Sequence, residues 1–166
     1  MKVLVTGGAG FIGSTVCSAL LDEGHTPVII DDLSTGRAEF VADRIFFRGD
    51  VADGSLLDRV FADHPEIDTV IHCAAAIVVP ESVRLPLHYY RNNVANTIAL
   101  LEHLLRHKCR RVLFSSSASI YRPGPDFSVD EDSSLDPSSP YAATKAMIDT
   151  ILSDCAAAGA IQAVSL

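Results

Sequence analysis

The sequence contains no tryptophan, no pair of cysteines at the C-x-x-C spacing and no apolar run long enough to cross a bilayer. Its four cysteines lie far apart, which excludes a disulfide-rich scaffold and favours reduced, buried thiols. The apolar start of the chain is broken at residues 6–8, before it reaches the length of a signal-peptide core. The longest mainly apolar stretch, residues 70–79, is interrupted by His72. These absences predict a cytoplasmic protein without a membrane segment.

Positive charge is also scarce, because 13 Lys and Arg stand against 21 Asp and Glu, for a net charge of −8. An acidic chain suits neither nucleic acid nor an anionic membrane, so neither is expected as a partner. The apolar fraction of 48% excludes a disordered or collagen-like chain, and 166 residues suit one domain. His103 and His107 lie four residues apart, but no glutamate stands between them as in metalloproteases, so no metal site is expected.

Two hydrophobic periodicities alternate along the chain. Short apolar runs predict strands at residues 2–6, 27–31, 44–47, 69–73 and 111–115, and a sixth from residue 161. Helical spacing and capping residues predict helices at residues 11–23, 53–63 and 86–107, and from residue 139 to near residue 159. Residues 122–139 are expected to form a loop. The predicted fold is α/β: a Rossmann-type, doubly wound parallel sheet with helices on both faces, forming one domain over residues 1–166.

Three glycines, Gly7, Gly10 and Gly13, occupy the turn between the first predicted strand and the first predicted helix. Without Cβ atoms the backbone can turn sharply and approach a pyrophosphate, while the helix N-terminus offers free N–H groups and the positive end of its dipole. An acidic residue ends the second predicted strand, as the dinucleotide-binding fingerprint requires. We interpret the turn as a dinucleotide site, against the alternative of a packed glycine turn that binds nothing.

The acidic residue is Asp31, eighteen residues after Gly13. Its carboxylate is placed to accept hydrogen bonds from the adenosine ribose and would repel a 2′-phosphate, which favours NAD over NADP as the cofactor. Arg37 would favour NADP, but it lies further along the loop and is interpreted as a solvated charge. Asp50 and Val51 follow the third predicted strand, where they can hold the adenine edge or simply lead into the next helix.

Tyr141 and Lys145 lie four residues apart at the start of a predicted helix, so the phenol and the ammonium share one face. A nearby cation lowers a tyrosine pKa from its usual value of about 10, and the phenolate can then act as a base. Ser115 and Ser117 lie at the end of the fifth predicted strand, where ligands of doubly wound sheets bind. We predict a catalytic group of Ser117, Tyr141 and Lys145, although each pattern alone would describe an ordinary helix face or strand end.

Taken in order along the whole chain, these motifs resemble those of the extended short-chain dehydrogenase/reductase family, and within it the nucleotide-sugar epimerases. The matching segments are residues 5–13, 31–36, 49–51, 72–75, 81–83, 89–94, 114–121 and 139–145. Related 4,6-dehydratases carry an Asp-Glu pair where this chain has Ala118 and Ser119, which disfavours elimination of water. The alternatives are another nucleotide-sugar dehydratase or reductase, and an NAD-binding fragment without catalytic activity.

The resemblance implies NAD-dependent epimerisation at C4 of a UDP-hexose through transient oxidation to a 4-keto sugar, in a homodimer. It implies contacts to the pyrophosphate from Phe11 and Ile12, and to the adenine from Asp50 and Val51. It assigns the adenosine to Asp31, Asp32, Leu33, Ser34, Thr35 and Gly36. It places residues 73–77 along the cofactor path, among them Cys73, Ala74, Ala75 and Ile77, together with Asn92, Ser115, Tyr141 and Lys145.

Three features depart from the family pattern. Ile77 stands where many relatives carry a lysine, so one phosphate contact is expected to be lost. Arg122 replaces the glycine expected after Tyr121, which predicts a different loop there. The chain ends at Leu166, within the predicted sixth strand, so the substrate domain of the family is expected to lie outside these residues. We therefore expect the 166 residues alone not to epimerise a sugar.

Overall fold

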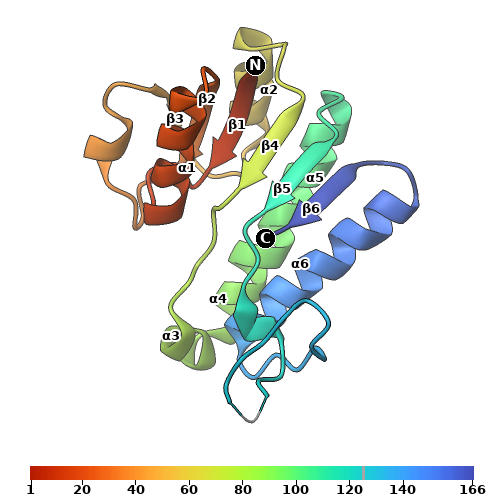
Figure 1. Ribbon diagram of the computed structural model, residues 1–166. Coiled ribbons are helices and arrows are strands. Elements are labelled where there is room, and N and C mark those ends of the chain that lie inside the picture. Colours follow the sequence, from red (N-terminus) through yellow and green to blue (C-terminus); the bar gives the residue numbers. More distant parts are fainter. Residues whose placement is uncertain (125) are drawn as a thin grey trace.

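The computed structural model describes residues 1–124 and 126–166 and is built around one six-stranded sheet (Figure 1). The strands are β1 (Lys2–Thr6), β2 (Thr26–Asp31), β3 (Ile45–Arg48), β4 (Thr69–His72), β5 (Arg111–Phe114) and β6 (Gln162–Ser165). Their order is β3-β2-β1-β4-β5-β6, and every neighbouring pair is parallel. This arrangement confirms the predicted doubly wound, Rossmann-type sheet.

Helices and short 3₁₀ segments connect the strands. They are α1 (Phe11–Asp22), η1 (Ala38–Val41), α2 (Gly54–Asp63), α3 (Val79–Arg84), α4 (Pro86–Tyr89), α5 (Asn96–Arg106), η3 (Ala118–Ile120) and α6 (Pro140–Ala157). The predicted caps are present: the Asp53 carboxylate accepts from the backbone N–H of Ser55 and Leu56, at 2.9 and 3.1 Å. Likewise, the Ser139 hydroxyl accepts from Ala142 N at 3.1 Å, immediately before Pro140. Each cap satisfies N–H groups that the first helical turn leaves without a partner.

Both faces of the sheet are covered by packed side chains. Successive residues of a strand point to opposite sides, so neighbouring residues of β1 enter two different core clusters. Val3 and Val5 pack in one core cluster with Cys17 of α1 and Val41 of η1. Leu4 lies in a second, larger cluster that includes side chains of α2, α5 and α6. The carboxyl ends of β1 and β4 lie side by side at the point where the chain connections diverge, which is where ligands of such sheets bind.

The helix predicted over residues 86–107 contains a π-helical segment, η2 (Tyr90–Ala95), between α4 and α5. A π segment displaces a backbone carbonyl from the regular hydrogen-bond ladder, and here the Thr97 hydroxyl donates to the Asn93 carbonyl at 2.5 Å. The short helix α3 was not predicted from the sequence. Its sequence mixes apolar and polar residues without a clear helical or strand period, so tertiary contacts decide its conformation.

The loop after β5 folds back on itself. Tyr121 and Leu135 form an isolated antiparallel bridge, and Arg122 N donates to Ser134 O at 2.8 Å. The Arg122 guanidinium pairs with the Asp136 carboxylate at 3.0 Å, so the arginine at the position expected to hold glycine contacts its own loop. None of the helices in the described part of the chain is long and apolar enough to cross a membrane.

Candidate functional site

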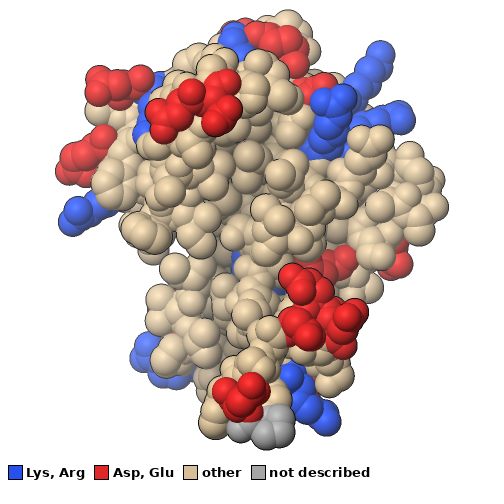
Figure 2. Space-filling view, in the orientation of Figure 1, with Lys and Arg blue, Asp and Glu red and all other residues tan. Residues whose placement is uncertain are grey.

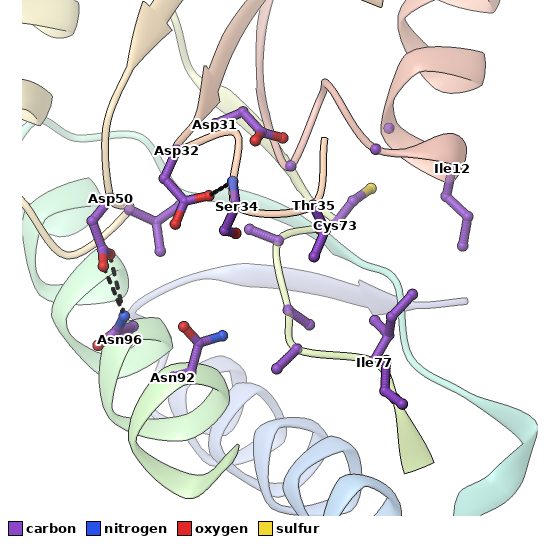
Figure 3. A pocket seen from close by; sticks show the side chains of 18 of the residues that line it. Ile12, Asp31, Asp32, Ser34, Thr35, Asp50, Cys73, Ile77, Asn92 and Asn96 are labelled. Carbon is purple, nitrogen blue, oxygen red and sulfur yellow. Dashed lines mark hydrogen bonds between the residues drawn. The ribbon is translucent and has the colours of Figure 1, made fainter. Parts of the chain in front are cut away.

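A cavity of about 440 Å³ opens beyond the carboxyl ends of the central strands (Figure 3). Its walls come from the glycine turn after β1, the loop after β2, the turn after β3, the loop after β4, and the helical stretch that contains Asn92 and Asn96. All of these segments follow or face the switch point between β1 and β4. The cavity therefore lies where the sequence predicted a dinucleotide.

The glycine turn has a geometry that side chains would not permit. Gly7 has φ of +70°, and a Cβ there would lie 2.7 Å from Ala74 N. A Cβ on Gly13 would collide with the Gly7 carbonyl oxygen. Gly10 is the N-cap of α1 and carries no side-chain cap, so N–H groups of the first helical turn are available to a ligand in the cavity.

Asp31 is nearly buried, at 8% exposure, yet it lines the cavity. Its Oδ2 accepts from Ala9 N at 3.0 Å, and its Oδ1 accepts from Leu33 N at 2.8 Å. A carboxylate oxygen can accept about two hydrogen bonds, so each oxygen keeps capacity for a further donor. Asp31 thus holds the glycine turn against the loop after β2, and the same carboxylate can accept from a ligand hydroxyl.

Most of the residues predicted to contact the cofactor line this single cavity. They are Gly7, Gly10, Phe11, Ile12, Gly13, Asp31, Asp32, Ser34, Thr35, Asp50, Val51, Cys73, Ala74, Ala75, Ile77 and Asn92. Two others lie behind its wall: Leu33 packs against the cluster beneath α1, and a Cβ on Gly36 would lie 2.7 Å from Ala9 Cβ. Ser115, Tyr141 and Lys145 lie outside the residues that line it.

Sequence reasoning missed five cavity residues: Gly49, Val78, Glu81, His88 and Asn96. Asn96 follows Asn92 by four residues, so helical spacing would have placed both amides on one face. Gly49 and Glu81 lie in segments that match the family pattern, which could have pointed to them. Val78 and His88 lie in segments whose path depends on tertiary contacts, and no spacing marked them.

Two buried side chains hold the wall formed by the loop after β4. The Asn93 amide accepts from Ala76 N at 2.8 Å and donates to Ala76 O at 3.0 Å. Its Nδ2 also donates to the Thr144 hydroxyl of α6 at 3.0 Å. The Tyr89 hydroxyl accepts from Val78 N at 2.9 Å. This wall is therefore fixed by the protein itself, as a preorganised site requires.

The Lys145 ammonium is 3% exposed and donates to the Ser115 carbonyl oxygen at 2.7 Å. Its Nζ lies 4.6 Å from the ring centroid of Phe114 and 5.9 Å from that of Tyr141. Burial lowers the Lys145 pKa to about 8, because removal from water disfavours the charged form. The structure thus brings Tyr141, Lys145 and the end of β5 together, and the spacing predicted a shared helix face for the first two.

Of the serines after β5, Ser116 is held by α6, whereas Ser117 contacts Ser119. Ser116 Oγ donates to Asp149 Oδ2 at 2.6 Å, and Ser165 Oγ donates to Asp149 Oδ1 at 2.6 Å. Ser117 Oγ lies 2.8 Å from Ser119 Oγ and accepts from Ser119 N at 3.2 Å, as the N-cap of η3. Asp149 was not predicted, and it joins the ends of β5 and β6 to the helix that carries Tyr141 and Lys145.

No group of three His, Cys, Asp or Glu side chains in residues 1–124 and 126–166 is arranged to hold a metal ion. His107 Nε2 is paired with the Asp58 carboxylate at 2.8 Å, and His103 contacts Arg106. The four cysteines are free thiols, and burial raises the pKa of Cys17 to about 11 and of Cys109 to about 12.

Comparison with known proteins identifies the family. The profile of the NAD dependent epimerase/dehydratase family matches residues 3–166. The chain belongs to this family. It is 47% identical to a UDP-glucose 4-epimerase of Azospirillum brasilense, over 99% of this chain and 47% of that protein. The chain thus spans about half the length of the curated relatives it matches.

Solved structures of the family superpose closely. The UDP-glucose 4-epimerase of Brucella ovis in complex with NAD has a TM-score of 0.92 and 38% identity, over 99% of this chain and 50% of that one. The UDP-glucose 4-epimerase of Bifidobacterium longum in complex with NAD+ and UDP has a TM-score of 0.90 and 32% identity, over 99% and 52% of the two chains.

Proposed function

We propose that residues 1–166 form an NAD-binding domain of an epimerase that acts at C4 of a nucleotide sugar. One observation carries the proposal: a single cavity at the switch point joins the glycine turn, the Asp31 carboxylate and the loop after β4. The glycines leave room for a pyrophosphate, the uncapped N-terminus of α1 supplies donors for it, and Asp31 supplies an acceptor for a ribose. These residues fit NAD.

We assign the cofactor contacts along the cavity in the order of its segments. Phe11 and Ile12 lie at the start of α1, where the first helical N–H groups face the pyrophosphate. The loop after β2 contacts the adenosine, and Asp50 with Val51 contacts the adenine edge. Residues 73–77 and Asn92 form the wall toward the nicotinamide end. Ile77 is 61% exposed and apolar, so it supplies no charge to a phosphate.

The proposed catalytic residues are Ser117, Tyr141 and Lys145. NAD, when bound, supplies a reversible hydride acceptor for transient oxidation of the sugar at C4. Tyr141 removes the proton from the 4-hydroxyl and later returns it, with the Lys145 ammonium 5.9 Å from the centroid of its ring. Ser117 Oγ exchanges its contact with Ser119 for a hydrogen bond to the sugar oxygen. The proposed substrate is a UDP-hexose, in line with the relatives described above.

The cofactor assignment predicts that the chain binds NAD at least tenfold more tightly than NADP. The 2′-phosphate of NADP would bring negative charge against the Asp31 carboxylate, which Ala9 N and Leu33 N hold in place. Calorimetric titration with each dinucleotide measures the ratio. As a control, Asp22→Asn removes a carboxylate at the end of α1, outside the residues that line the cavity, and the preference should persist. Equal or tighter binding of NADP would contradict the role assigned to Asp31.

We also propose a homodimer that uses α5 and α6. Many apolar side chains of these helices and of η2 belong to the core: Val94 of η2, Leu101 of α5, and Ile151 and Cys155 of α6 lie in or pack against the larger cluster. On the other face of the sheet, drawn in Figure 2, charged side chains lie mainly toward the edge. Ile98 and Met147 are 41% and 45% exposed, so α5 and α6 each keep an apolar side chain at the surface. Two such helices from each subunit would form a four-helix interface.

The dimer proposal predicts that Met147→Lys shifts the chain toward the monomer in sedimentation velocity at micromolar concentration. The change places a charge on an exposed apolar position of α6. Leu21→Lys is the matched control, because Leu21 is similarly exposed, at 47%, but lies on α1. A parent chain that sediments as a clean monomer would count against the dimer.

A further inference from the structure

The turn after β3 is tied to the helix opposite by one side chain. Asn96 Nδ2 donates to both carboxylate oxygens of Asp50, at 3.2 Å to Oδ1 and 3.3 Å to Oδ2 (Figure 3). The two residues are 46 positions apart in the sequence, and both line the cavity. The contact therefore lies at the end of the cavity that is assigned above to the adenine.

The hydrogen bonds of Asp50 leave one oxygen with spare capacity. Oδ1 accepts from Ala52 N at 2.8 Å and from Asn96, whereas Oδ2 accepts from Asn96 alone among the described residues. Because each carboxylate oxygen accepts about two hydrogen bonds, Oδ2 keeps a free acceptor position. Asn96 and Ala52 together fix the plane of the carboxylate, and with it the direction of that free position.

Asn96 occupies a position that its helix propensity does not favour. The chain is helical without interruption from Pro86 to Arg106, so Asn96 lies in the interior of a helical stretch. Asparagine is a poorer interior helix residue than alanine. The contact with Asp50 accounts for an asparagine at this position, whereas helix propensity does not.

We propose that Asn96 is a positioning residue that orients the Asp50 carboxylate to recognise the exocyclic amine of adenine. The inference rests on the proposed function, because it takes the cavity to hold NAD. An ionised carboxylate only accepts hydrogen bonds, so it favours a base that presents an amine there. It disfavours hypoxanthine, which presents a carbonyl oxygen at the same position. Asn96 itself acts through Asp50.

The expected size of the effect follows from the exposure of Asp50. Asp50 is exposed, so its side chain without Asn96 would be free to change rotamer and would have to be ordered on binding. Ordering one such side chain weakens binding by about 3- to 10-fold. The penalty falls on a ligand that uses the carboxylate, and therefore on adenine rather than on hypoxanthine.

The test compares two dinucleotides and two variants. Binding of NAD and of nicotinamide hypoxanthine dinucleotide is measured by titration calorimetry for the parent chain, Asn96→Ala and Asp58→Asn. Alanine is the better helix former, so Asn96→Ala is expected to fold, which a thermal melt followed by circular dichroism verifies. Asp58→Asn is the matched control, because it weakens a different carboxylate contact, from Asp58 of α2 to His107 at the end of α5, away from the cavity.

We expect Asn96→Ala to lose about 3- to 10-fold in NAD affinity and to bind the hypoxanthine analogue as the parent does, so that the ratio of the two affinities falls. Asp58→Asn should keep the parent ratio. If Asn96→Ala weakens both dinucleotides equally, or neither, the inference is overturned while the proposed function stands. If the parent chain binds no NAD, both are overturned.

Discussion

Replacement of Tyr141 by phenylalanine is expected to lower turnover by about 10²–10⁴-fold, the usual loss when a general acid–base group is removed. The variant keeps the aromatic ring, 5.9 Å from Lys145 Nζ, but has no hydroxyl to take a proton from the sugar. NAD affinity should change by no more than a few fold, because Tyr141 lies outside the residues that line the cavity. The rate is measured as conversion of UDP-galactose to UDP-glucose. The protein assayed is a chain that carries residues 1–166 together with a substrate domain of the family.

Tyr90→Phe is the matched control for the loss of a phenolic hydroxyl. Tyr90 is half-buried in η2, which packs against α6, and it lies outside the residues that line the cavity. Its variant should keep the parent rate. Turnover of Tyr141→Phe close to that of the parent would remove Tyr141 from the mechanism, whatever its distance from Lys145.

The sequence predicted the parts of the site that depend on local spacing. The glycine turn and Asp31 were predicted because strand, turn and helix follow one another within about thirty residues, so their positions are linked by the chain itself. Tyr141 and Lys145 were predicted because four residues make slightly more than one helical turn, which puts both side chains on one face. Asp53 and Ser139 were predicted because a cap acts on N–H groups two or three residues away.

What the sequence did not predict depends on contacts between distant segments. The π segment η2 is accompanied by bonds from Asn93 to Ala76 and to Thr144, which is 51 residues away. The contact between Asn96 and Asp50 spans 46 residues, and Asp149 joins two strand ends. Local propensity carries no information on such pairs, because the same residues would be ordinary polar surface if the sheet placed them apart.

His72, which interrupts the apolar run of residues 70–79, joins three parts of the fold. It is 3% exposed at the end of β4, with Nδ1 2.6 Å from Thr6 Oγ1 and Nε2 2.9 Å from Thr97 Oγ1. The Thr97 hydroxyl already donates to the Asn93 carbonyl, so it accepts from His72 Nε2–H. Nδ1 is then the acceptor for the Thr6 hydroxyl. The neutral imidazole therefore fits this site, whereas a second ring proton would oppose the Thr6 bond.

Acidification from pH 6.5 to pH 5 is expected to remove about 2 kcal/mol of unfolding free energy through His72 alone. Burial lowers the His72 pKa from its usual 6.5 to about 3, with the Lys145 charge as a smaller cause. Between these two values the unfolded chain binds one proton more than the folded chain. Stability is therefore complete above pH 6.5 and falls by about 1.4 kcal/mol for each pH unit as the pH drops toward 3.

Urea unfolding of the parent chain and of His72→Gln at pH 7 and pH 5 measures this contribution, because the other titrating groups are common to both chains. We expect His72→Gln to be less stable than the parent at pH 7 and to lose about 2 kcal/mol less on acidification. His88→Asn is the control, since His88 is an exposed imidazole on α4, and it should follow the parent. Equal losses in the parent and His72→Gln would mean that the buried imidazole accepts its proton without unfolding. The Thr6 contact, which lies beside the glycine turn, would then tolerate a charge.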